Sequence, residues 1–126
     1  MKHINYGKTE QSRKGDFAEY YAVTWLWDNG YEVFQNCGCT GPIDMIAMDK
    51  KGNTLLIDVK TEGLDDPRCD NSAYVVKHIR TKVQKKLGVI LLGFNPVTRA
   101  LRFVHHGISG GAAKVLHKKL KMENSK

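Results

Sequence analysis

Two stretches of the sequence decide the fold: Ile43-Asp44-Met45-Ile46-Ala47-Met48 and Thr54-Leu55-Leu56-Ile57-Asp58-Val59-Lys60. A polar, glycine-containing segment at 49–53 separates them, and this order is typical of a β-hairpin. Side chains in a strand alternate between its two faces, so Asp58 shares a face with Lys60.

A hairpin folded about Lys51 sets the register of the two strands. Its pairs are Met48–Thr54, Ile46–Leu56 and Asp44–Asp58. Like charges placed opposite each other destabilise a strand pair, and apolar neighbours limit how far water relieves the repulsion. A divalent cation between the two carboxylates would remove it. Lys60 lies on the same face as Asp58, about 6–7 Å further along the strand.

Two facing carboxylates beside a lysine are suited to a hard cation and a phosphate. Mg²⁺ is typically held by one or two carboxylates, with water and substrate phosphate completing its octahedron, and Mn²⁺ is the expected substitute. The metal would polarise the phosphate and help to generate hydroxide. Lys60 could position the attacking water or offset charge in the transition state. The alternative is a surface ion pair of Asp58 with Lys60, worth at most about 1 kcal/mol.

This pattern resembles that of the PD-(D/E)XK nuclease superfamily. The residues that carry the resemblance are Pro42-Ile43-Asp44 and, after the hairpin, Asp58-Val59-Lys60. The sequence departs from the commonest pattern in two ways, because Ile43 separates Pro42 from Asp44 and because Asp58 stands where Glu is more usual. The resemblance implies an α/β, restriction-endonuclease-like α-β-β-β-α-β core, with a mixed central sheet flanked by helices.

The composition predicts one basic globular domain over residues 1–126. The hydrophobic content is 41%, and 20 Lys and Arg against 13 Asp and Glu give a formal charge of +7. A small basic protein commonly binds a polyanion, of which nucleic acid is the first candidate, although excess lysine also favours solubility. No glycine loop of the P-loop or dinucleotide type occurs, so we expect no organic cofactor.

The cysteines and the hydropathy predict a cytoplasmic protein, and the resemblance implies one that is associated with the nucleoid or encoded by a phage. Cys37, Cys39 and Cys69 are an odd number without zinc-site spacing, which is typical of reduced thiols. No stretch is apolar enough to span a membrane, and the first residues have no signal-peptide core.

A helix is expected at 13–29, capped by Ser12 and preceded by a loose arm at 1–12. Glu19 leans toward the covered side of this helix, where an acidic residue needs a partner. The G-x-x-x-E spacing from Gly15 to Glu19 is similar to the first core helix of several superfamily branches, which lends an acid to the metal site. The alternative is a helix-surface glutamate paired with a lysine.

Candidate DNA contacts gather around the proposed metal site. Gly15 would let a backbone approach a phosphate, and Thr61 follows the candidate lysine. A second helix is expected at 76–87, with Ile79, Val83 and Leu87 as its apolar line. The candidate DNA-binding residues are Arg13, Lys14, Gly15, Thr61, Lys77, Arg80 and Gln84, of which Gln84 could instead reach a backbone or the site.

The remaining segments complete the expected core. The other expected strands are 31–36, 89–92 and 100–105; the strand at 89–92 should run parallel to the one at 54–60 because a helix connects them. The loop at 64–71 is rich in turn residues. A lysine-rich helix at 112–122, within a basic tail at 109–126, could dock on the body, pair with a second subunit or lie along DNA.

The sequence therefore predicts a Mg²⁺-dependent endodeoxyribonuclease that hydrolyses phosphodiester bonds, with Asp44 and Asp58 as metal ligands, Glu19 assisting and Lys60 orienting water. Its small size, its G-x-x-x-E helix and its Asp58-Val59-Lys60 hairpin followed by a basic helix look most like Holliday-junction-resolvase-type enzymes, which would make it structure-selective. One site per chain implies a homodimer for cutting two strands. The alternatives are a site-specific homing or restriction-type endonuclease, carried by a phage or an intron, and a non-catalytic DNA-binding module of the same fold.

Overall fold

The computed structural model describes residues 10–38, 40–69 and 72–104. Most of the predicted arm, the end of the predicted last strand and the helix at 112–122 lie outside these residues. The elements are α1 (Glu10–Asp28), β1 (Glu32–Gln35), β2 (Met45–Met48), β3 (Thr54–Thr61), β4 (Gly63–Leu64), β5 (Tyr74–Val75), α2 (Lys82–Leu87), β6 (Ile90–Phe94) and β7 (Leu101–Phe103).

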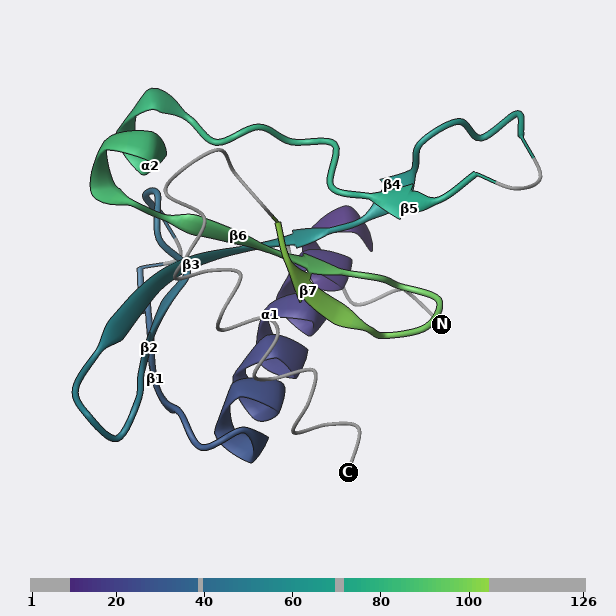
Figure 1. Cartoon of the computed structure of the whole chain (residues 1–126). Coiled ribbons are helices and arrows are strands. Elements are labelled where there is room, and N and C mark those ends of the chain that lie inside the picture. Colours follow the sequence, from purple (N-terminus) through teal and green to yellow (C-terminus); the bar gives the residue numbers. More distant parts are fainter. Residues whose placement is uncertain (1–9, 39, 70–71, 105–126) are drawn as a thin grey trace, which may run out of the picture.

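The main sheet has five strands in the order β1-β2-β3-β6-β7 (Figure 1). The pairs β1–β2, β2–β3 and β6–β7 are antiparallel, whereas β3 and β6 are parallel. The predicted parallel pairing of the central strands is therefore confirmed. The continuous apolar run of β6 is buried along its whole length, as expected for a strand covered on both faces.

The β2–β3 hairpin has the predicted register in its regular part, with Met48 paired to Thr54 and Ile46 paired to Leu56. The turn is held by the Asp49 carboxylate, which accepts hydrogen bonds from the backbone N–H groups of Lys51 and Asn53. Such an Asx arrangement explains locally why the chain reverses here.

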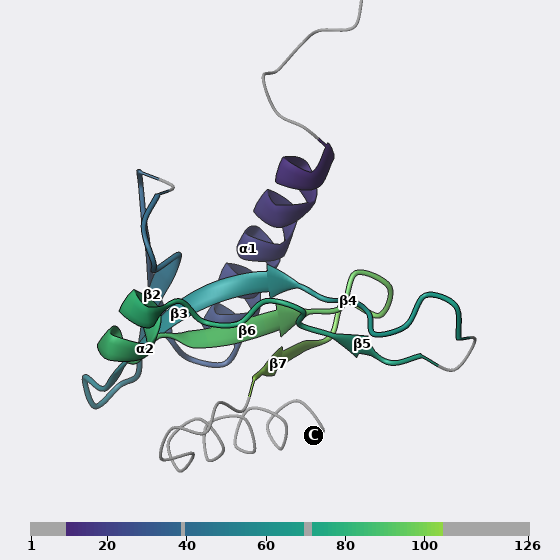
Figure 2. The ribbon, with the colours of Figure 1, turned by 90° about the horizontal axis from the view of Figure 1, so that it is seen from above.

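Helix α1 covers one face of the sheet (Figure 2). Its buried side chains Ala18, Ala22 and Leu26 join a core with residues of the central strands, among them Ile57 and Leu92. The helix begins at Glu10, so the predicted cap at Ser12 and the loose arm at 10–12 are wrong. The Glu10 carboxylate pairs with Lys14 one turn later, which favours the earlier start.

The helix predicted at 76–87 is only half present. Thr81 caps α2 in a capping box with Gln84, and Gly88 ends it in a left-handed conformation. Residues 76–81 are not helical, and the residues before them, Tyr74–Val75, form β5, which pairs with β4 in a separate two-stranded ribbon. Ile79 is 86% exposed, and Val83 and Leu87 are also exposed, so the predicted apolar line is not buried.

Among the helices of the described residues, none combines the length and the apolar character required to cross a membrane.

Candidate active site

Asp44 lies where β2 separates from β3. Its backbone N–H donates to the Ile57 carbonyl oxygen over 2.9 Å, and its carboxylate Oδ2 accepts the Val59 N–H over 2.7 Å. The Asp44 carboxylate thus accepts a β3 backbone N–H, as a carbonyl oxygen of a neighbouring strand otherwise would. Asp44 stands one residue beyond the regular ladder, and its carboxyl group is still close enough to that of Asp58 for the two acids to interact.

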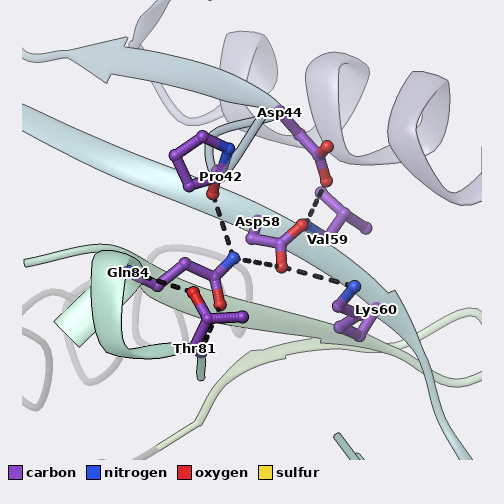
Figure 3. Close-up of polar contacts among 7 residues, drawn as sticks. All are labelled: Pro42, Asp44, Asp58, Val59, Lys60, Thr81 and Gln84. Carbon is purple, nitrogen blue, oxygen red and sulfur yellow. Dashed lines mark hydrogen bonds and ion pairs between the residues drawn. The ribbon is translucent and has the colours of Figure 1, made fainter. Parts of the chain in front are cut away.

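Asp58 is buried on β3 and is held from two sides. Its Oδ2 accepts a hydrogen bond from Gln84 Nε2 over 2.8 Å and lies 3.4 Å from Lys60 Nζ (Figure 3). The predicted Asp58–Lys60 proximity is therefore present, with Asp58 on the interior side rather than in an exposed ion pair.

Gln84, at the start of α2, is hydrogen-bonded to site residues that are remote from it in the sequence. Besides its bond to Asp58, Nε2 donates to the Pro42 carbonyl oxygen over 3.0 Å, and Oε1 accepts the Thr81 N–H. Gln84 thus reaches both a backbone and the site, which is one of the alternatives the sequence left open. Since its amide also belongs to the capping box, the start of α2 fixes the position of the amide beside Asp58.

Glu19 approaches the same carboxyl pair from α1. It lines a hollow of about 220 Å³ together with Asp44 and with Asp16, Tyr20, Gln35, Asn36 and Cys37. The negative charge of Glu19 acts on Asp44. The structure therefore brings Glu19, Asp44, Asp58 and Lys60 into one region, with Glu19 on the α1 side of the sheet.

The pKa of Asp44 is raised from 3.8 to about 8. Burial is the largest cause, the hydrogen bond with Asp58 adds to it, and the charges of Asp58 and Glu19 contribute further, whereas the Val59 N–H acts in the opposite direction. Near neutral pH the Asp44 carboxyl group therefore keeps its proton when no cation is bound.

The donor set fits Mg²⁺ or Mn²⁺. Carboxylate oxygens are the ligands that these hard cations prefer, and Mg²⁺ usually keeps several waters. Within 10–38, 40–69 and 72–104, no group of three or more His, Cys, Asp or Glu side chains is gathered tightly enough to hold an ion. The predicted three-acid metal set of Glu19, Asp44 and Asp58 is therefore not gathered in this part of the chain, and Asp44 and Asp58 would be the two direct ligands.

The predicted DNA-binding residues differ in their exposure to solvent. Arg13, Lys14 and Gly15 are exposed near the start of α1, and Lys77 is exposed after β5. Arg80 is buried instead, and its guanidinium donates to the Val89 carbonyl oxygen over 3.1 Å. The prediction that Arg80 lies on an exposed helix face is wrong, because the chain at 76–81 is not helical and passes against the sheet.

Sequence reasoning missed several residues around the site. Asp16 and Asn36 line the hollow with Glu19, and Glu62 is a buried acid next to the end of β3. Asp16 could have been found because it precedes Glu19 by three residues, which places both on one side of a helix. Glu62 had a signal as well, since it continues the alternation of Asp58 and Lys60.

No protein-family model and no curated protein matches the chain. A solved structure does match, with 15% sequence identity, a TM-score of 0.63 and coverage of 94% of this chain and 98% of the other. This chain shares the fold of I-Ssp6803I, a bacterial homing endonuclease. The similarity confirms the predicted fold class and relates this chain to a nuclease at the level of the fold.

Proposed function

We propose that the protein is a metal-dependent endonuclease that hydrolyses phosphodiester bonds in DNA. The observation that carries this proposal is the arrangement of Asp44, Asp58 and Lys60: the carboxyl groups of Asp44 and Asp58 interact with each other, and Lys60 Nζ lies 3.4 Å from Asp58 Oδ2. Acidic residues with a purely structural role need not stand so close together that the pKa of one carboxyl group rises to about 8. The basic net charge of +7 supports a polyanionic substrate.

Each side chain has a defined task in this proposal. Asp44 and Asp58 would hold Mg²⁺, which when bound supplies Lewis-acid polarisation of the phosphate and a more acidic water. Gln84 keeps the Asp58 carboxylate in place, and Lys60 offers an ammonium group to the attacking water or to the charge that develops on the phosphate. Glu19 adds a proton acceptor or outer-sphere ligand from α1.

The test is cleavage of DNA in Mg²⁺ by the wild type and by Asp44→Asn and Asp58→Asn. We expect both variants to lose cleavage by about a thousandfold or more, while DNA binding in Ca²⁺ is retained. Asp28→Asn, at the exposed end of α1, is the matched control and should cleave normally. Cleavage by Asp44→Asn at the wild-type rate would end the catalytic assignment.

The substrate is proposed to be double-stranded DNA, cut either at a specific site or at a branched structure. The fold-level similarity to a homing endonuclease supports the site-specific alternative, and the small domain is compatible with a junction-resolving enzyme. A panel of linear duplex, flap and four-way DNA separates the two. DNA binding in Mg²⁺ and in Mn²⁺ without any product would instead indicate a non-catalytic module.

We further propose a homodimer, because one chain carries one candidate site and a duplex has two strands to cut. Sedimentation of the protein with and without DNA tests this. The homodimer proposal would be contradicted if a single chain bound to DNA cut both strands in one binding event.

A further inference from the structure

A second buried acid lies beyond the lysine of the candidate site. The Glu62 side chain is only 3% exposed, and its Oε2 lies 2.7 Å from Arg102 Nε on β7. Arg102 also donates from its terminal nitrogen to the Tyr74 carbonyl oxygen of β5. The proposed reaction gives Glu62 no task, so its burial next to the site requires an explanation.

The sheet register places this acid between two cations. Lys60 pairs with Gly93 of β6, and Gly93 pairs with Arg102 of β7, so the three residues form one row across the sheet with their side-chain directions on one face. A Cβ at Gly93 would lie 3.2 Å from Glu62 Oε2. The Glu62 carboxylate therefore occupies the space above Gly93, with Lys60 on one side and Arg102 on the other.

Lys60 could thus pair with either of two acids. It now lies 3.4 Å from Asp58, and its side chain is 34% exposed, so its flexible stem has room to move. A buried carboxylate without a partner is strongly destabilised and attracts the nearest mobile cation. The short Glu62–Arg102 contact removes that attraction.

We propose that Arg102 is a positioning residue for Lys60: by neutralising Glu62 it leaves the Lys60 ammonium group beside Asp58. This inference rests on the proposed nuclease function only for its kinetic consequence. Without the Arg102 charge, Lys60 turns toward Glu62 and leaves the reacting phosphate.

The experiment compares the wild type with Arg102→Met, Glu62→Gln and the double variant. Arg102→Met should lower kcat by about tenfold or more with little change in KM, and Glu62→Gln should leave kcat unchanged. The double variant should return to within about threefold of the wild type, because the competing acid is gone. Arg102→Lys, which keeps a cation, should retain most of the activity.

Three results would overturn the inference. An unchanged kcat in Arg102→Met would mean that another group, such as Lys77 beside Gly63, neutralises Glu62. Equal losses in Arg102→Met and the double variant would mean that Arg102 acts on DNA or on the fold directly. A large loss in Glu62→Gln alone would give Glu62 a role of its own. Thermal melts verify folding, and Arg102→Gln replaces Arg102→Met if the latter does not fold.

A second readout does not depend on cleavage. The chemical shift of Lys60 Cε should change when Asp58→Asn is introduced into the wild type. The signal is assigned as the one that is lost in Lys60→Arg. In the Arg102→Met background it should respond to Glu62→Gln instead. If the wild type cleaves no DNA, the nuclease proposal fails while this measurement still tests the position of Lys60; a signal that never responds to Glu62→Gln rejects the inference.

Discussion

Asp44 stands at a position where two requirements conflict. Its carboxylate replaces a backbone partner by accepting the Val59 N–H, which favours the charged form, while burial and the neighbouring Asp58 favour the neutral form. The second group of effects is larger, and the pKa rises to about 8. A divalent cation would reverse the balance by making both charges favourable.

The raised pKa predicts how the metal-free protein responds to pH. Between 3.8 and about 8 the folded state binds more protons at Asp44 than the unfolded state does, so the free energy of unfolding falls as pH rises through this window. Asp44→Asn removes this contribution. In EDTA, the variant should gain stability relative to the wild type as the pH rises from about 4 to about 8 in urea unfolding. A constant difference across that range would contradict the raised pKa.

Gly93 is a second residue at which a small change has a large effect, because there is no room for a Cβ atom. A Cβ there would lie 2.8 Å from Val76 Cγ2, in addition to its contact with Glu62. Gly93→Ala should therefore lower the free energy of unfolding by about 1–3 kcal/mol. Gly15→Ala is the matched control, since no atom lies within 4 Å of a Cβ at that helical position and the change should stabilise by up to about 1 kcal/mol. Urea titrations measure both; equal effects would reject the packing argument.

At the scale of elements, the start of α2 is coupled to the candidate site. The same Gln84 amide completes the capping box with Thr81 and holds both Asp58 and the Pro42 carbonyl group. A short helix with exposed apolar residues contributes little core, so its position depends on these polar contacts. The helix therefore holds the Gln84 amide group beside Asp58.

Two substitutions distinguish the effect of the helix cap on stability from the effect of Gln84 on the candidate site. Thr81→Ala and Gln84→Ala should each cost about 1 kcal/mol of stability, because each opens the capping box. Gln84→Ala additionally removes a hydrogen bond from buried Asp58, so its cleavage rate should fall by about tenfold or more, and clearly further than that of Thr81→Ala. Thermal unfolding and cleavage kinetics measure the two effects. Equal cleavage rates in the two variants would show that Gln84 acts only through the cap.

At the scale of the molecule, the site joins parts of the chain that are remote in sequence. Glu19 comes from α1, Asp44 and Asp58 from the ends of the hairpin, and Gln84 from α2. A cation that binds the folded protein at Asp44 and Asp58 would therefore stabilise the assembly as a whole. The stabilisation follows from mass action, because the unfolded chain does not bring these carboxylates together.

Mg²⁺ should raise the thermal midpoint of the wild type in a concentration-dependent manner. At a concentration of about 100 times the dissociation constant the gain is about 2.7 kcal/mol. Asp44→Asn and Asp58→Asn should show little gain, whereas Asp28→Asn should behave as the wild type. Scanning calorimetry with titrated MgCl₂ measures this, and equal shifts in all four proteins would place the cation elsewhere.

The hairpin and its acid-acid-lysine set were predictable from the sequence, because strand alternation and a polar turn are local properties that fix which residues share a face. Glu19 was reachable through helical spacing and family resemblance. Only the tertiary structure decided the burial of Arg80 and the contacts of Gln84 with Asp58 and of Glu62 with Arg102. These depend on strands and loops separated by up to 40 residues. Contacts over such separations arise from sheet order and packing, which local periodicity does not encode.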